Sequence, residues 1–201
     1  MLENKKYHHG DLKNALIQAG IAILSEEGLN ALSLRKVAQR AGVSHAAPYA
    51  HFADKQALVA AISTEGYRCL YDQMYAVVQL YRDDPQRQLF EGAWAYVQFA
   101  LDDPAHFKIT LSGAVEMEKE YPAFVELSHK SFELVLEIVQ RCQSVGTLKP
   151  GSPVLMAMSV WSLVHGFVSL YLEGQFASEF SDPAVLRQAL IFALEQMISH
   201  Y

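Results

Sequence analysis

The sequence predicts an all-α protein with a three-helix N-terminal domain, residues 1–54, followed by a longer helical bundle, residues 55–201. Two observations predict this class. Apolar residues recur at intervals of three and four, which is the spacing of one buried helix face. Residues that cap or begin helices, such as Ser33 and the pair Asp182-Pro183, separate these apolar runs. A chain of 201 residues that is 51% hydrophobic is long enough to bury a large core.

The first predicted helix follows Asp11, which would be its N-cap, and ends at Gly28. Leu12, Leu16 and Ile23 lie on one of its faces. We expect this face to pack against apolar residues further along the chain. These residues are Leu32, Leu34, Val37, Val43 and Phe52.

The stretch Ser33–Lys55 is expected to form two short helices joined by a sharp turn. Ser33 is a suitable N-cap for the first helix. Gly42 then supplies the left-handed backbone with which one helix can stop and the next begin. Ser44 would cap the second helix, and Pro48 falls in its first turn, where a missing N–H costs least.

Two helices joined by such a turn match the helix-turn-helix, whose second helix enters the major groove of double-stranded DNA. In that helix, residues 45–51, His45 can bond to a base edge or a phosphate, whereas Ala46 and Ala47 can touch only thymine methyls or sugars. Tyr49 suits either a phosphate contact or the core. The predicted DNA-binding residues are Ser33, Arg35, Lys36, Ser44, His45, Ala46, Ala47, Tyr49, His51 and Lys55.

Several residues around this turn resemble the signature of the TetR family of bacterial transcriptional repressors. They are Gly42-Val43-Ser44, Tyr49, His51-Phe52 and Lys55. The resemblance covers residues 7–60 and implies an all-helical homodimer with a larger ligand-sensing domain. Pro48 and its neighbouring alanines depart from the more usual Gly-Thr-Leu type of sequence, and Ala50 replaces a commonly larger residue. The base contacts of typical family members therefore cannot be assigned directly to this chain.

The charge distribution agrees with a DNA-contacting domain on an acidic body. The chain carries a net charge of −6, but residues 1–60 have a balance of +2 and the remainder has −8. Because residues 1–60 carry only a small excess of positive charge, we expect DNA binding to depend on a few specific side-chain contacts and on dimerisation.

The body is expected to contain five further helices and one short apolar segment. Their predicted ranges are 55–82, 85–101, 106–111, 122–146, 155–172 and 184–200. The most apolar stretch, Val154–Leu172, contains serines, His165 and Gly166, and we interpret it as a buried helix and not as a membrane span. Its Trp161, His165 and Gly166 resemble the signature of a TetR subgroup with a Trp-His-Gly ligand domain, so the resemblance extends over the whole chain.

The family resemblance implies an effector pocket inside the body. The candidate lining residues are Trp94, Phe107, Trp161 and His165, although aromatic residues at helical spacing are more often core. Since no arginine or lysine belongs to this set, the hypothesis is a small, mostly apolar effector. Residues 155–172 and 185–198 are the expected dimer helices, because both are more apolar than one covered face requires.

Other function classes find little support in the sequence. There is no nucleophile elbow, phosphate-binding loop or zinc motif, so we expect neither an enzyme nor a metal or other cofactor site. Cys69 and Cys142 match no disulfide or metal pattern, and Met1–Lys6 does not resemble a signal peptide, which favours the cytoplasm. The hypothesis is a TetR-type repressor released from an inverted-repeat operator by its effector. The alternative is a helical ligand-binding or interaction module without specific DNA binding.

Overall fold

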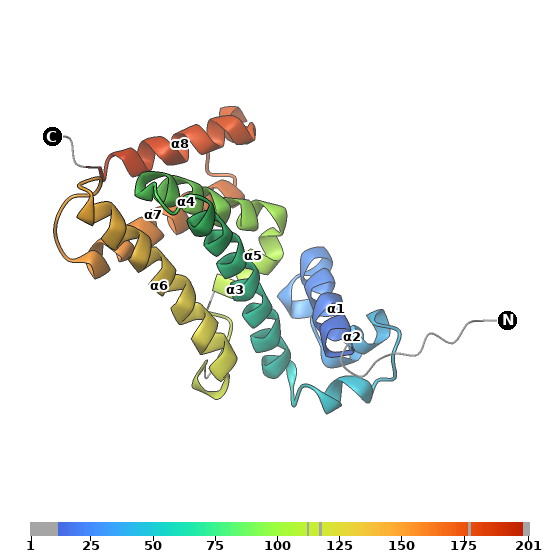
Figure 1. Cartoon of the computed structure of the whole chain (residues 1–201). Coiled ribbons are helices and arrows are strands. Elements are labelled where there is room, and N and C mark those ends of the chain that lie inside the picture. The colour runs from blue at the N-terminus through green and yellow to red at the C-terminus, as the bar shows by residue number, and fades with distance from the viewer. Residues whose placement is uncertain (1–11, 112, 117, 177, 199–201) are drawn as a thin grey trace. The chain divides into compact units, whose positions relative to one another are not determined.

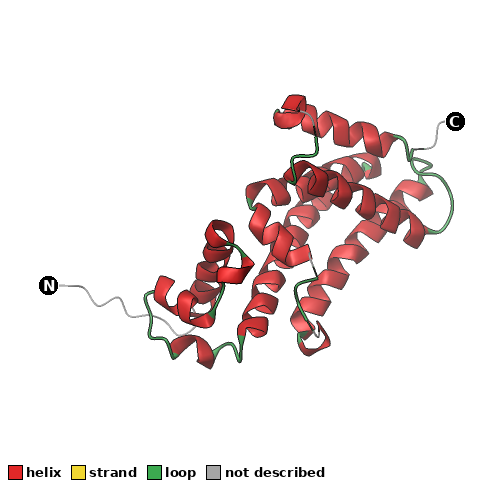
Figure 2. Cartoon of the chain, turned by 180° about the vertical axis from the view of Figure 1, so that it is seen from behind, coloured by secondary structure: helices red, strands yellow, loops and turns green. Residues whose placement is uncertain are grey.

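Helices form all the regular secondary structure in the part of the chain that the computed structural model describes, residues 12–111, 113–116, 118–176 and 178–198 (Figure 1, Figure 2). The α-helices are α1 (Leu12–Glu27), α2 (Leu34–Arg40), α3 (Lys55–Leu80), α4 (Pro85–Asp102), α5 (Pro104–Leu111), α6 (Pro122–Ser144), α7 (Pro153–Leu172) and α8 (Pro183–Glu195). The 3-10 helices are η1 (Leu29–Ala31), η2 (Ala47–Ala50), η3 (Glu118–Glu120) and η4 (Ser178–Ser181). The all-α class predicted from the sequence is therefore confirmed.

The contacts divide the chain into two compact units. Unit 1 consists of residues up to 66 together with 105–125, and unit 2 consists of residues 67–104 and 126–201. α3 thus contributes its first half to unit 1 and its second half to unit 2. A functional boundary after Asp54 stays a prediction, because compactness does not show where DNA binding ends.

Unit 1 is built around the buried face of α1. Leu16 and Ile23 are fully buried, as are Val37 and Ala38 of α2, and Phe52 is buried with them. This is the packing that the helical spacing predicts, except that Val43 is only half-buried. The expected cap at Asp11 lies outside the described residues.

A polar seam joins α5 to the first half of α3 within unit 1. Ser63 Oγ donates to the carbonyl of Ile109 at 3.2 Å, and His106 Nε2 lies 3.0 Å from the carbonyl of Ile62. Gly66 is required at this crossing, because a Cβ there would lie 1.9 Å from Thr110 Oγ1. α5 is therefore held on α3 by hydrogen bonds running in both directions between side chains and backbone carbonyls.

Unit 2 packs the second half of α3 with α4, α6, α7 and α8. Side chains cap three of these helices: Asp84 accepts from Arg87 N, Ser152 from Leu155 N and Asp182 from Ala184 N. The last helix ends at Glu195, so the predicted extension toward residue 200 is wrong. Ile198 instead pairs with Leu148 in an isolated antiparallel bridge.

α7 is less buried than its sequence suggests. Among the described helices, α7 is the one whose length and composition would allow it to cross a membrane. Yet only 22% of its most apolar 18-residue stretch is buried within the chain. The prediction of a buried helix is therefore wrong for the chain taken by itself. Its buried residues, Ala157, Val160, Val164 and Val168, form a single face, and the remaining apolar side chains need another partner.

Candidate nucleic-acid interface and effector pocket

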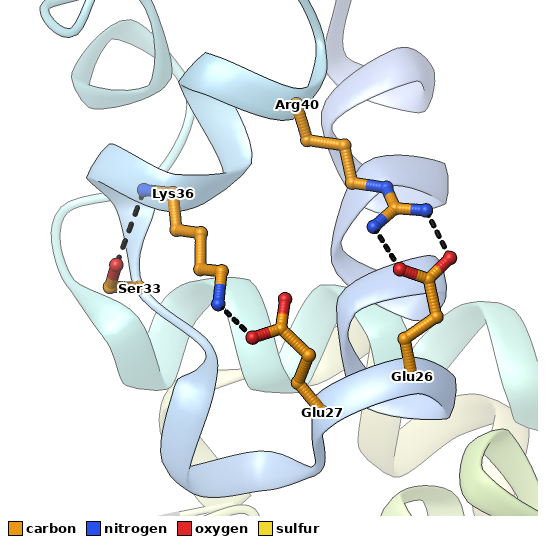
Figure 3. A network of polar contacts seen from close by, with 5 residues as sticks. All are labelled: Glu26, Glu27, Ser33, Lys36 and Arg40. Atoms are coloured by element: carbon orange, nitrogen blue, oxygen red, sulfur yellow. Dashed lines mark hydrogen bonds and ion pairs between the residues drawn. The ribbon is translucent and has the colours of Figure 1, made fainter.

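The helix-turn-helix begins as the sequence predicts. Ser33 caps α2 by accepting a hydrogen bond from Lys36 N at 3.2 Å (Figure 3). Gly42 adopts a positive φ of 69°, which ends α2 and redirects the chain. Val43 N then donates back to the carbonyl of Ala38 at 3.0 Å, and this bond closes the turn.

The second helix of the motif differs from the prediction. Residues 45–51 form turns around the 3-10 helix η2 instead of an α-helix capped by Ser44. Pro48 explains the difference, because it lacks the N–H that an α-helix would direct to the carbonyl of Ser44. Ala47 N donates to this carbonyl instead, at 3.0 Å, with the tighter spacing of a 3-10 turn.

This segment nevertheless presents to solvent four of its six predicted DNA-binding residues. Ser44, His45 and Ala46 are exposed, and Tyr49 is 61% exposed, which places its side chain outside the core. Ala47 and His51 are half-buried, while Pro48 is buried beneath them. Because residues 41–53 contain no Asp, Glu, Lys or Arg, the exposed surface carries no full charge while its histidines are neutral.

The cations of α2 are held by carboxylates at the end of α1 (Figure 3). Lys36 pairs with Glu27, and both terminal nitrogens of Arg40 bond to the carboxylate of Glu26. The hydrogen bonds from Arg40 lower the pKa of Glu26, so this carboxylate stays ionised. Sequence reasoning missed these pairs. The i, i+4 spacing of Lys36 and Arg40, which places them on one helix face, was the available signal.

The two remaining predicted cations are differently placed. Arg35 is exposed. Lys55, at the start of α3, donates from Nζ to the carbonyl of Leu29 at 3.0 Å. An exposed lysine that also bonds to the backbone is fixed in position, which is suitable for contact with a phosphate.

Unit 2 contains a small cavity among α3, α4, α6 and α7. Its volume is about 30 Å³, which is space for a water-sized group, and its surface is almost wholly apolar. The lining residues are Met74, Leu89, Gly92, Ala93, Tyr96, Val135, Ile138, Val160, Trp161 and Val164. Of the four predicted effector residues, only Trp161 lines this cavity.

The other three predicted residues are not brought together around the cavity. His165 reaches it through Tyr96, whose Oη lies 2.8 Å from His165 Nδ1. Trp94 is half-buried in α4 and is absent from the lining. Phe107 is buried in α5, which belongs to unit 1.

Sequence reasoning missed Tyr96, which lines the cavity and carries a hydroxyl group. Trp161 Nε1 donates to Tyr96 Oη at 3.4 Å, and Tyr96 can donate in turn to His165 Nδ1. Burial raises the pKa of Tyr96 far above its usual range, and burial lowers the pKa of His165. Both groups are therefore neutral at pH 7, and they form one hydrogen-bonded chain beside an apolar space.

Unit 1 contains a wider cleft of about 550 Å³ beside the starts of α1, α3 and α6. Lys13, Glu65 and Glu120 contribute charges of both signs to its lining. This cleft is open and of mixed polarity, unlike the apolar pocket predicted for the body. Among the described residues, no group of three or more His, Cys, Asp and Glu side chains is arranged to hold a metal ion.

An exposed helix-turn-helix joined to a helical unit with a small apolar cavity is the arrangement of a class of DNA-binding transcriptional regulators. Two family comparisons agree with this class. Residues 16–62 match the family described as "Bacterial regulatory proteins, tetR family", and residues 89–194 match the "Tetracyclin repressor-like, C-terminal domain". The chain belongs to the TetR family and is a TetR-type transcriptional regulator.

Solved structures with similar folds extend over nearly the whole chain. A protein of unknown function from Rhodococcus sp. RHA1 is 27% identical, with a TM-score of 0.81, and the match covers 98% of this chain and 100% of that one. A bacterial regulatory protein of the tetR family from Rhodococcus RHA1 is 18% identical, with a TM-score of 0.76 and coverages of 94% and 97%. The TetR family regulator PfmR from Thermus thermophilus is 20% identical, with a TM-score of 0.69 and coverages of 89% and 96%. No curated protein matches the sequence.

Proposed function

We propose that this regulator is a cytoplasmic, non-enzymatic repressor that binds an inverted-repeat operator as a homodimer and leaves it when a small, mostly apolar effector binds unit 2. The observation that carries the proposal is the exposed segment 44–49. Its solvent-facing side chains have no role in the core, since Pro48 is its buried member. This surface follows a capped helix and a glycine turn, and its exposed side chains do not contribute to the core. Such a surface is suited to contact a groove of DNA.

Dimerisation is supported by apolar side chains that the chain itself leaves uncovered. Leu155 of α7 and Phe192 of α8 are each 65% exposed, and Met158 and Leu170 of α7 are also exposed. Burying them against a second copy would account for the apolar character of α7 without a membrane. A two-fold dimer would present two reading segments, and such pairs bind half-sites about 34–36 Å apart, or a multiple of that distance.

An effector site in unit 2 is supported by the chemistry of the small cavity. Its apolar lining favours an apolar ligand, and the Tyr96–His165 pair offers one polar contact. Because the cavity is small, about 30 Å³, a drug-sized ligand requires the surrounding helices to separate. Binding therefore selects a wider state of unit 2, which can differ in its affinity for DNA.

The test is fluorescence anisotropy with labelled DNA from upstream of the protein's own gene, compared with scrambled DNA over a series of salt concentrations. Specific binding that weakens as salt rises is expected. Adding apolar compounds that raise the Tm of the protein should then release the DNA. Stabilisation by anionic or metal ligands alone would contradict an apolar effector.

A second candidate is a helical interaction module that no longer binds specific DNA. The absence of Lys and Arg from residues 41–53 and the ion pairs of Lys36 and Arg40 favour it. The same anisotropy experiment separates the two functions. Equal affinity for operator and scrambled DNA at every salt concentration would support the module and exclude the repressor.

A further inference from the structure

The exposed part of the segment that follows Gly42 has an unusual composition for a surface that contacts nucleic acid. Within residues 43–51 the exposed members are Ser44, His45, Ala46, Tyr49 and Ala50, and none of them is an Asp, Glu, Lys or Arg. Ala46 has a helical backbone conformation, with φ of −82° and ψ of −23°, directly before η2. Its methyl group is therefore a fixed apolar point at the start of the element that would face a groove.

Two cations of α2 do not change the chemistry of this point. Lys36 and Arg40 bond to Glu27 and Glu26 at the end of α1. Arginine and lysine are the usual partners of guanine in the major groove, and residues 41–53 contain neither. Among the exposed side chains of the segment, hydrogen-bonding readout is thus left to Ser44, His45 and Tyr49.

In the major groove, thymine differs from cytosine by the C5-methyl group and by the group at C4, which is an acceptor in thymine and a donor in cytosine. An alanine side chain can contact a methyl group, but it can neither donate nor accept a hydrogen bond. It is therefore blind to the group at C4. We infer that Ala46 reads the C5-methyl group of a pyrimidine in each half-site, so that 5-methylcytosine can replace thymine there. This inference rests on the proposed DNA binding and specifies its chemistry.

The inference is tested with operator duplexes that change one methyl group at a time. Each pyrimidine of the half-site is tested in two base pairs. Opposite adenine, thymine is compared with deoxyuracil, and opposite guanine, 5-methylcytosine is compared with cytosine. Each change is made in both half-sites at once. Burying one methyl group changes affinity about fourfold. At one position we expect the methyl group to strengthen binding roughly 15-fold when it is present in both half-sites. The factor should be similar in the pair with adenine and in the pair with guanine.

A pair of matched variants assigns the methyl effect to its residue. Ala46→Gly should reduce the ratio of thymine to deoxyuracil affinities to about one at that position. Ala53→Gly makes the same change at an exposed alanine beside the cleft of unit 1 and should keep the full ratio. Because each ratio compares two DNAs with one protein, a general loss of affinity in a variant does not affect it.

Different outcomes overturn different claims. Specific binding that is indifferent to every methyl group, or a methyl effect confined to thymine, would overturn this inference and leave the regulator intact. An undiminished ratio in Ala46→Gly would also overturn it. Absence of any sequence-specific binding by the unmodified protein would overturn the proposed repressor and this inference together.

Discussion

The titration of His165 should affect the stability of the folded protein. Burial lowers its pKa in the folded protein, so the unfolded chain binds a proton at a higher pH than the folded chain does. The stabilising effect of the neutral imidazole is therefore complete above the unfolded pKa of about 6.5. It is lost as the pH falls from that value toward the lower folded pKa.

We expect the His165→Gln variant to lose less stability than the original protein between pH 7 and pH 5, because glutamine does not titrate. The measurement is Tm against pH at one protein concentration. Only the slopes of the two curves are compared, so a constant difference in Tm between the proteins does not affect the result. Parallel slopes would show that other groups control the acid sensitivity.

Ser33 tests the start of α2 at the scale of one hydrogen bond. Ser33→Ala removes the acceptor of Lys36 N and should lower the free energy of unfolding by about 1 kcal/mol. Urea unfolding measures this change. Ser144→Ala is the control, because the Ser144 hydroxyl is exposed at a helix end, and its loss should change stability by less than about 0.5 kcal/mol. An equal cost for both variants would refute the cap.

Among the elements, the crossing of α5 over α3 depends on a glycine. Gly66→Ala places a Cβ against Thr110 Oγ1 and must separate the two helices or move Thr110. We expect unfolding to become easier by about 1–3 kcal/mol, the usual cost of overpacking. The hydrogen bonds of Ser63 and His106 across the seam would lengthen with it.

Gly92→Ala is the matched control for this crossing. Gly92 is also a buried helical glycine, but its added Cβ would meet only Ile138 Cδ1, at an ordinary 3.6 Å. Since alanine favours a helix over glycine by up to about 1 kcal/mol, this variant should be neutral or more stable. Urea unfolding of both variants decides the matter, and similar stabilities would show that the α3–α5 crossing adapts without cost.

For the whole molecule, the decisive question is what covers α7 and α8. Phe192→Glu places a charge on the exposed apolar face of α8, so we expect sedimentation analysis to show a shift from dimer to monomer. Leu80→Glu is the control: Leu80 is 71% exposed at the end of α3, away from both helices in sequence, and its change should leave the dimer intact. If the Phe192→Glu variant dimerised with the affinity of the original protein, this face of α8 could not be the dimer interface.

Much of the helical order follows from local patterns in the sequence. The caps at Ser33 and Asp182, the helix start at Pro122 and the turn at Gly42 all lie where the sequence predicts them. These features depend on residues within one helical turn of each other. The reason why residues 45–51 do not form the predicted α-helix is also local. Pro48 has no N–H to donate to the carbonyl of Ser44, so this carbonyl accepts a 3-10 hydrogen bond from Ala47 N.

The candidate sites depended on contacts between residues distant in the chain. Helical spacing shows which face of a helix is buried, but not which helix it meets, because a stripe of apolar residues fits many partners equally well. Trp161 and His165 could thus be named as candidates, while their partner Tyr96, more than sixty residues earlier, could not. Phe107 looked equivalent to them and belongs to the other unit. The family, the first helix of the motif and its glycine turn were determined by the sequence alone. The polar chain beside the cavity and the ion pairs of α2 were decided only when the helices packed.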